Sequence, residues 1–280
     1  MRIKALFVGL VLVVSASFVK GQTEKKYPEP TPMTHEMTEF WVPQPRITEP
    51  GKTVSERILV QPPSDAIVLF DGTNLSEWEA APGKKATVKG KDASNFKSSE
   101  ESAARWTVKD GVFIVNKKAG DIQTKRVFGD FQLHIEWCVP KDIHGENQGR
   151  GNSGVFLQGM YEVQILDSYK NETYANGQAG SIYKQTPPLV NAMRQPGEWN
   201  EYDIIYTAPT FKEDGTYRTR PIVTVIHNGV VVQNNTVILG TTPFVGLPQV
   251  VPHGKGPIRL QAHGDKSEPI SFRNIWIREL

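Results

Sequence analysis

Two neighbouring segments decide the fold prediction: Asn152-Ser153-Gly154-Val155-Phe156-Leu157 and Tyr161-Glu162-Val163-Gln164-Ile165-Leu166-Asp167. In the second segment, apolar residues at 161, 163 and 165 alternate with polar Glu162 and Gln164. This alternation predicts a β-strand with one buried face and one polar face. Glu162 and Gln164 would then lie about 7 Å apart along the same face.

Asp167 falls on the apolar side of a regular strand. A β-bulge near Leu166 would turn it towards the Glu162 face, because a bulge inserts one extra residue into a strand. An acid, an amide and a second acid would then share one sheet surface, which is typical of sites that handle carbohydrates. The alternative is an ordinary solvated sheet face.

Short apolar segments of this kind recur from residue 64 to residue 280, separated by turns rich in Gly, Pro and Asn. Asn228-Gly229 between two such segments indicates a β-hairpin. No window of ten or more residues has helical periodicity, and residues 80–104 are polar enough to predict a long loop. The pattern predicts an all-β fold, a sandwich of two sheets.

The chain before residue 64 divides into two parts. Residues 1–21 have the basic start and apolar stretch of a secretory signal peptide, with Gly21 at the cleavage position. The apolar stretch is short for a membrane span, and an uncleaved N-terminal anchor is the alternative. Residues 22–63 are rich in Pro and charge and predict an extended arm that leads into the domain or packs over it. Phe40-Trp41-Val42 is the segment expected to pin the arm down.

Charge and cysteine content restrict the class of protein. The chain has 32 basic and 30 acidic residues. Loss of residues 1–21 removes Arg2, Lys4 and Lys20, which leaves 29 bases against 30 acids. A nearly neutral protein is unlike a dedicated nucleic-acid binder. Cys138 is the single cysteine, so no intrachain disulfide forms, and we expect a buried, inert thiol. Export without disulfides is consistent with the bacterial periplasm or the extracellular space.

The order of motifs over about residues 64–280 resembles one family. The motifs are Phe70-Asp71-Gly72-Thr73-Asn74-Leu75-Ser76-Glu77-Trp78, Phe131-Gln132-Leu133-His134-Ile135-Glu136, Asn152-Ser153-Gly154, residues 161–167, Gly180-Ser181-Ile182-Tyr183, Glu198-Trp199-Asn200, Asn228-Gly229, Leu260-Gln261-Ala262-His263-Gly264 and Phe272-Arg273-Asn274-Ile275. This set resembles the 3-keto-disaccharide hydrolase family, also described as 3-keto-glucoside 1,2-lyase/2-hydroxy-glucal hydratase. The resemblance implies a concanavalin A-like, glucanase-like jelly roll of two curved antiparallel sheets that holds a carbohydrate on its concave face.

Ten residues are candidates for the site. Three are candidate catalytic groups: Glu162, Asp167 and His263. Seven are candidate substrate-binding groups: Glu136, Asn152, Gln164, Lys184, Arg194, Trp199 and Gln261. Each also has a structural interpretation, such as a core aromatic for Trp199 or a solvated loop charge for Lys184 and Arg194. We expect the polar strand residues of both groups to meet in one cleft. No spacing requires a cofactor; a divalent cation held by Glu136, Glu162 or His263 is left open.

The spacing of the carboxylates bears on the reaction. Glu162 and Asp167 are five residues, or roughly 16 Å of straight strand, apart. A retaining glycosidase needs its two carboxylates about 5 Å apart and an inverting one about 6.5–9.5 Å. Conventional hydrolysis by this pair is therefore disfavoured.

The family resemblance implies a different route, open to 3-keto sugars. A base removes the C2 proton, the C1 substituent leaves, and water adds to the product. Glu162 or His263 could be the base and Asp167 the acid, while Lys184, Gln164 or Asn152 could stabilise the C3 oxygen. The alternatives are a conventional endo-glucanase-like hydrolase and a non-catalytic sugar-binding domain.

Overall fold

The computed structural model describes residues 31–51, 61–82 and 103–280. The predicted signal peptide and most of the predicted loop at 80–104 lie outside these ranges. The chain divides into two units at residue 32, and the fold described here belongs to the second, Met33–Leu280. Within the described ranges, no helix is both long and apolar enough to cross a membrane.

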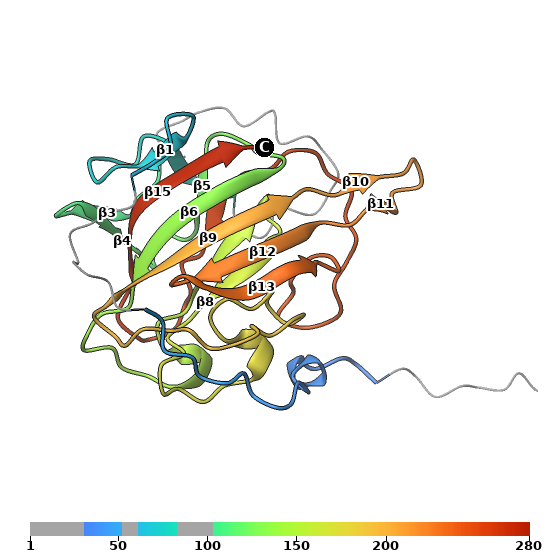
Figure 1. Ribbon diagram of the computed structural model, residues 1–280, viewed down its shortest axis with the longest axis horizontal. Coiled ribbons are helices and arrows are strands. Elements are labelled where there is room, and N and C mark those ends of the chain that lie inside the picture. Colours follow the sequence, from blue (N-terminus) through green and yellow to red (C-terminus); the bar gives the residue numbers. More distant parts are fainter. Residues whose placement is uncertain (1–30, 52–60, 83–102) are drawn as a thin grey trace, which may run out of the picture. The chain divides into compact units, whose positions relative to one another are not determined.

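Antiparallel strands form nearly all of the regular structure. The larger sheet has eight strands: β1 (Ile67–Phe70), β3 (Thr107–Lys109), β4 (Val112–Ile114), β6 (Phe131–Cys138), β9 (Trp199–Thr207), β12 (Ile222–His227), β13 (Val230–Val237) and β15 (Ser271–Glu279). Their order is β13-β12-β9-β6-β15-β4-β3, and β1 also pairs with β15. In Figure 1 the strands from β15 to β13 run side by side, with β8 of the other sheet behind them.

The smaller sheet has five strands: β2 (Trp78–Ala80), β5 (Ile122–Thr124), β7 (Ser153–Leu157), β8 (Tyr161–Ile165) and β14 (Arg259–Leu260). Their order is β2-β5-β14-β7-β8. A separate hairpin contains β10 (Thr210–Phe211) and β11 (Tyr217–Thr219), and the described helices are the 3-10 turns η1 (His35–Thr38), η4 (Asn147–Gly149) and η5 (Ala175–Gly177). These antiparallel sheets confirm the predicted all-β jelly-roll sandwich.

The core lies between the two sheets, because each strand turns alternate residues inward. In β6, Phe131, Leu133, Ile135 and Trp137 are fully buried in the same apolar cluster as Val163 of β8. Full burial of such side chains stabilises the fold by roughly 1.5–3 kcal/mol each. The predicted hairpin at Asn228-Gly229 is confirmed: both residues have positive φ, 53° and 78°, as a two-residue hairpin turn requires.

The N-terminal arm packs along the domain. Asn176 Nδ2 donates to the Thr38 carbonyl at 2.8 Å, and Thr48 N donates to the Asn191 carbonyl at 2.9 Å. The expected anchor is wrong, since Phe40 and Val42 are 71% and 85% exposed. Backbone carbonyls and polar side chains hold the arm instead of its aromatic residues.

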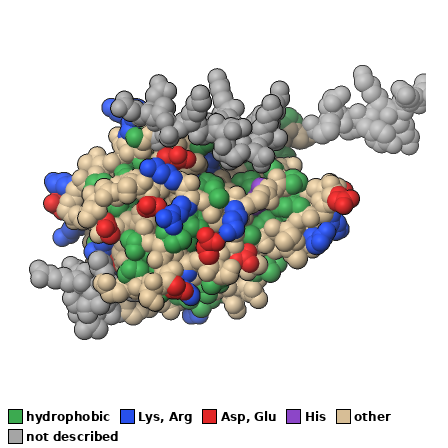
Figure 2. All heavy atoms as spheres, turned by 90° about the horizontal axis from the view of Figure 1, so that it is seen from above, with side chains coloured by type: hydrophobic (Ala, Val, Ile, Leu, Met, Phe, Trp, Pro, Cys, Tyr) green, Lys and Arg blue, Asp and Glu red, His purple; other side chains and the backbone are tan. Residues whose placement is uncertain are grey.

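Cys138 is partly exposed and not buried as expected, because it ends β6 on the outward side next to Trp137, which faces the core. On the face seen in Figure 2, acidic and basic side chains are interspersed and form no large patch of one sign. This mixture agrees with the nearly balanced charge of the chain.

Candidate functional site

Strand register places a set of polar residues on the outer face of the smaller sheet. Arg259 pairs with Phe156, and Phe156 pairs with Glu162. In the neighbouring row, Gly154 pairs with Gln164, and Gln261 N donates to the Gly154 carbonyl at 3.1 Å. Val155 and Val163 between these rows face the core. We call the outer surface formed by these two rows the Glu162 face.

The two polar side chains that β8 contributes to the Glu162 face are buried, which a solvated sheet face would not show. Glu162 is 4% exposed and Gln164 is 1% exposed. The loop that contains η4 covers them in part, since Gln164 Nε2 donates to Gln148 Oε1 at 3.0 Å. Asn152 Nδ2 also donates to Gln148, at its carbonyl oxygen, at 2.8 Å. Gln148 therefore fixes the direction of both amides.

Two amide oxygens of this face have no hydrogen-bond partner among the described residues. They are Gln164 Oε1 and Gln261 Oε1, and both are buried. They belong to strands on either side of Gly154. A buried acceptor without a partner costs free energy, about 1–3 kcal/mol. Such a pair suits a ligand that brings hydroxyl donors.

The Glu162 carboxylate occupies the space that Gly154 leaves free. A Cβ atom on residue 154 would lie 2.9 Å from Glu162 Cδ and closer still to Oε1. A glycine here lets the carboxylate lie against the sheet, next to the row of Gln164 and Gln261. The strand register places Glu162 beside Phe156. Because residue 154 has no side chain, the Glu162 carboxylate can lie over Gly154, at the centre of the face.

Arg259 supplies a positive charge on the same face. Its guanidinium stacks over the Phe156 ring, 4.0 Å from the ring centroid, and its Nε lies 3.8 Å from Asp121 Oδ2. Burial lowers the pKa of Arg259, while the charges of Asp121 and Glu162 raise it. The Phe156 ring and the Asp121 carboxylate hold the guanidinium in place, as a cation close to the Glu162 carboxylate.

Two tyrosines lie beside Glu162. The hydroxyls of Tyr174 and Tyr183 are 2.9 Å apart, and Tyr183 N donates to the Glu162 carbonyl at 3.0 Å. Burial and the charge of Glu162 raise the pKa of Tyr183 to about 12, although the hydrogen bond with Tyr174 lowers it. Both phenols stay protonated near neutral pH and can donate hydrogen bonds.

Lys184 lies near these tyrosines, but its ammonium group is engaged by the arm. Nζ donates to the His35 carbonyl at 3.0 Å, forms an ion pair with Glu39 and lies 4.1 Å from the Tyr174 ring centroid. Lys184 was a candidate to bind substrate. The geometry shows instead a lysine that ties the arm to the Glu162 face.

His263 forms a dyad with an aspartate. Its Nδ1 lies 2.8 Å from Asp265 Oδ2, and the side chain is 36% exposed. Burial raises the pKa of Asp265, but hydrogen bonds from His263, Lys117 and Ser267 outweigh it and lower the pKa to about 2. The charged aspartate at Nδ1 orients the imidazole ring.

Asp167 does not take part in the Glu162 face. Oδ2 lies 2.7 Å from Arg150 Nε, Oδ1 accepts from Tyr169 N at 3.0 Å, and the Cβ packs near Gly151 and Val139. Burial raises the pKa of Asp167, and the Arg150 charge lowers it in part. Both oxygens are committed, so Asp167 holds the loop after β8 in place. The bulge expected to bring it beside Glu162 is not what the structure shows.

Three candidate residues, Glu136, Arg194 and Trp199, do not lie on the Glu162 face. Glu136 pairs in register with Arg273 and Glu201, on the outward side of β6 in the larger sheet, opposite the core-facing Trp137. Glu136 and Trp199 therefore face away from the smaller sheet. The prediction that Glu136 and Glu162 meet in one cleft is wrong, because β6 and β8 belong to different sheets.

Sequence reasoning missed Arg259, Asp265 and Gln148. Asp265 had a detectable signal, since an acid two residues after a histidine can orient the ring. Arg259 had a weaker one, because it has the two-residue spacing from Gln261 that puts both on one face. Gln148 had none, because its role depends on how a loop folds over the sheet.

The chain matches the model of the 3-keto-alpha-glucoside-1,2-lyase-like domain over residues 65–278. The chain belongs to this family. A solved protein from Parabacteroides distasonis ATCC 8503, provisionally named a glycosyl hydrolase, is 65% identical over 88% of this chain and 97% of that chain, with a TM-score of 0.72. Another from the same organism, with the same provisional name, is 18% identical over 77% of this chain and 94% of that one, with a TM-score of 0.48. No curated protein matches.

Membership of the 3-keto-alpha-glucoside-1,2-lyase-like family makes the protein a carbohydrate-active enzyme. A divalent cation was left open in the sequence analysis. Within the described ranges, no three His, Cys, Asp or Glu side chains are grouped so that they could hold a metal ion. Glu136 lies on the opposite sheet from Glu162, so these two carboxylates cannot bind one ion together.

Proposed function

We propose that the Glu162 face cleaves 3-keto-glucosides by removing the C2 proton and expelling the C1 substituent. The observation that carries the proposal is the Glu162 carboxylate beside two buried amide oxygens that lack partners. These oxygens would accept hydrogen bonds from sugar hydroxyls and hold the ring against the carboxylate. The family match supports the choice of substrate.

The steps use Glu162 and Arg259 of this face together with His263, two residues after Gln261 in the sequence. Glu162 takes the C2 proton, and the electron pair of the C2–H bond forms an enediolate whose negative charge rests on the C3 oxygen. Arg259 stabilises that charge, as a fixed cation does in a water-poor site. The enediolate then re-forms the C3 ketone while the C1–O bond breaks. His263, oriented by Asp265, donates the proton that the leaving oxygen needs, and water adds across the resulting double bond to complete net hydrolysis.

The structure gives a reason to favour this route over conventional hydrolysis. A two-carboxylate glycosidase needs a second acid at a defined distance from the first. Asp167, the acid paired with Glu162 in the sequence analysis, is bound to Arg150 and to a backbone N–H. Asp121, the acid beside Arg259, accepts a hydrogen bond from Ala262 N at 2.8 Å and lies 3.8 Å from the Arg259 Nε. Elimination from a keto sugar requires one carboxylate base, which Glu162 provides.

The test compares a 3-keto-glucoside with the same unoxidised glucoside, using wild type and Glu162→Gln. Glutamine keeps the size of the side chain but cannot accept the proton, so we expect release of the aglycone to fall about 10²- to 10⁴-fold. Exchange of the C2 proton with deuterated solvent should fall equally. Glu79→Gln is the matched control, because Glu79 lies on the same sheet face four strands away, roughly 19 Å.

Each contrary result identifies an alternative. Cleavage of the unoxidised glucoside at a similar rate would indicate a conventional glucanase-like hydrolase. Binding of both sugars without cleavage would indicate a non-catalytic sugar-binding domain. Normal C2 exchange in Glu162→Gln would show that the base is another residue, and His263 would be the next to test.

A further inference from the structure

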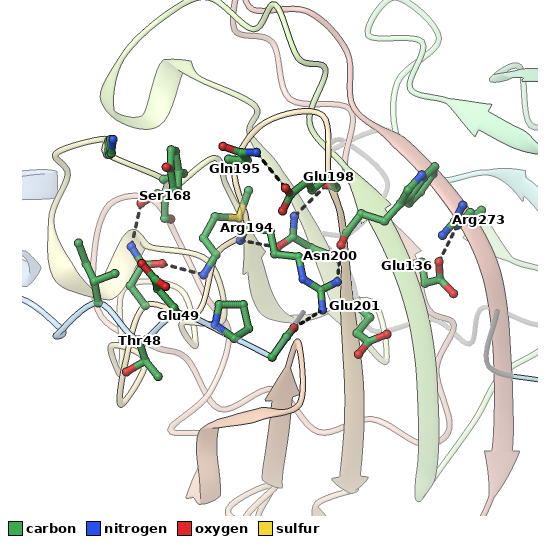
Figure 3. A pocket seen from close by; sticks show the side chains of 18 residues that line it. Thr48, Glu49, Glu136, Ser168, Arg194, Gln195, Glu198, Asn200, Glu201 and Arg273 are labelled. Atoms are coloured by element: carbon green, nitrogen blue, oxygen red, sulfur yellow. Dashed lines mark hydrogen bonds and ion pairs between the residues drawn. The ribbon is translucent and has the colours of Figure 1, made fainter. Parts of the chain in front are cut away.

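A pocket of about 760 Å³ opens on the outer side of the larger sheet. Residues of β6, β9 and β15 form its floor, and arm residues 47–51 and the segment 191–198 form its walls. Figure 3 shows these side chains converging from separate parts of the chain. The volume is in the range of small-molecule sites, about 300–1,000 Å³.

The floor contains a rigid stacked platform. The Arg273 guanidinium lies 4.0 Å from the centroid of the Trp199 ring, and its Nε lies 2.6 Å from Glu136 Oε2. Asn274 Nδ2 donates to Glu136 Oε1 at 2.7 Å. Burial raises the pKa of Glu136, but hydrogen bonds from His134, Asn274 and Arg273 lower it overall. These contacts hold an aromatic ring and a planar cation in one orientation.

Hydrogen-bond donors and acceptors surround the stacked Trp199 and Arg273 side chains. Arg194 donates from Nη1 to the Trp199 carbonyl at 2.7 Å and from Nη2 to the Gly51 carbonyl at 3.4 Å. Figure 3 shows the Glu201 carboxylate between Arg194 and the Glu136–Arg273 pair. No ion pair involves Glu201 among the described residues. Its oxygens are placed to accept hydrogen bonds from a ligand.

The charges of the lining define the ligand class. Four carboxylates (Glu49, Glu136, Glu198 and Glu201) face three cations (Lys170, Arg194 and Arg273). Such a balance offers no net attraction for phosphate or sulfate. A stacked aromatic ring and planar cation surrounded by donors and acceptors suit a neutral polyhydroxylated ring, whose hydroxyls can reach the polar groups of the rim.

We propose that this pocket is a second binding site, for a neutral oligosaccharide, separate from the Glu162 face. The two sites lie on the outer faces of opposite sheets, with the apolar core between them. Stacked sheets are about 10 Å apart, so one sugar ring cannot occupy both sites. The pocket binds one part of a glycan chain while the Glu162 face cleaves a 3-keto-glucoside unit at its end.

Calorimetric titration of the full chain tests this proposal with maltohexaose as the α-glucan probe and cellohexaose as the β-glucan probe. We expect saturable binding of at least one of them below about 10 mM. Glu201→Ala should weaken it about tenfold or more, the effect of losing a hydrogen bond to a charged group. Glu162→Gln should bind as tightly as wild type.

A spectroscopic measurement covers the case in which Glu201→Ala fails to fold. In wild-type protein, the indole N–H signal of Trp199, assigned with Trp199→Phe, should shift during the titration. The absence of binding by either probe would overturn the proposal. So would affinity that survives Glu201→Ala but is lost in Glu162→Gln, because the sugar would then sit on the Glu162 face.

Discussion

At the scale of single residues, the absent side chain of Gly154 is as important as the carboxylate it accommodates. We predict that Gly154→Ala lowers turnover about 10²-fold or more while the protein stays folded. The added Cβ would overlap Glu162 Oε1, which is the end of a flexible side chain and can swing away. A displaced base loses much of its contribution. Steady-state kinetics on a 3-keto-glucoside and a thermal melt measure the two effects.

Gly254→Ala is the matched control for that variant. No heavy atom lies within 4 Å of a Cβ built on residue 254, and its φ is outside the left-handed region. Activity in this variant should equal that of wild type. Full activity in Gly154→Ala would contradict the assignment of Glu162 as the base.

Some site residues could be predicted because their placement follows from the two-residue period of a strand. Glu162, Gln164 and Gln261 lie on one face for this reason. Asp167 could not be placed, because its position depends on where β8 ends and on the loop that presents Arg150. Lys184 could not be interpreted without the arm, since its partner Glu39 is 145 residues away in sequence.

At the scale of elements, the arm is an integral part of the domain. We predict that removal of residues 1–51 destabilises the protein by about 1–3 kcal/mol, the net effect of losing a few hydrogen bonds. Lys184 would lose Glu39 and the His35 carbonyl, and its ammonium group would become open to solvent. Denaturant unfolding of the shortened and full-length proteins measures the difference.

One comparison makes that experiment specific. Glu39→Gln in the full-length protein should cause part of the loss, because Lys184 then stays covered by the arm without its charged partner. Equal unfolding midpoints for all of these forms would show that the arm contributes no stability.

The strands themselves were largely predictable, and their assignment to sheets was not. The alternation of apolar and polar residues from 161 to 165 predicted a strand, and the structure has Tyr161–Ile165. Alternation shows which residues share a face of one strand. It does not show which strands pair, because that depends on contacts between distant segments. The error over Glu136 arose at this step.

At the scale of the whole molecule, two buried histidines limit stability at opposite ends of the pH range. Burial lowers the pKa of His134, but hydrogen bonds to Asp203 and Glu136 outweigh it and raise the pKa to about 9. Its stabilising effect is complete below about 6.5 and is lost as pH rises through 9. Burial lowers the pKa of His227 to about 3, so its effect is complete above about 6.5 and is lost as pH falls towards 3.

We therefore predict that the melting temperature is highest near neutral pH and falls on both sides. Asp203→Asn should move the alkaline decrease to lower pH, because the shortest hydrogen bond to His134, 2.8 Å from Nδ1 to Oδ1, loses its charge. His227→Asn should weaken the acid decrease. Thermal melts between pH 4 and pH 10 in steps of about one unit measure both. If the melting temperature of Asp203→Asn falls at the same alkaline pH as that of wild type, the role given to His134 is contradicted.

We also propose that the protein is exported and that its mature chain begins near Gln22. The basic start, the apolar stretch and Gly21 support the proposal. N-terminal sequencing of protein recovered from the envelope or medium of a bacterial host should begin near residue 22. A sequence that begins at Met1 would indicate an uncleaved anchor.

The single cysteine gives the molecule a natural attachment point. Cys138 is partly exposed and pairs in register with Trp199, at the margin of the pocket on the larger sheet. A thiol-reactive fluorophore would therefore attach at one known position without any engineered substitution. Its emission could report sugar binding in that pocket in real time. The Glu162 face stays unlabelled, so the reaction there could be followed in the same sample.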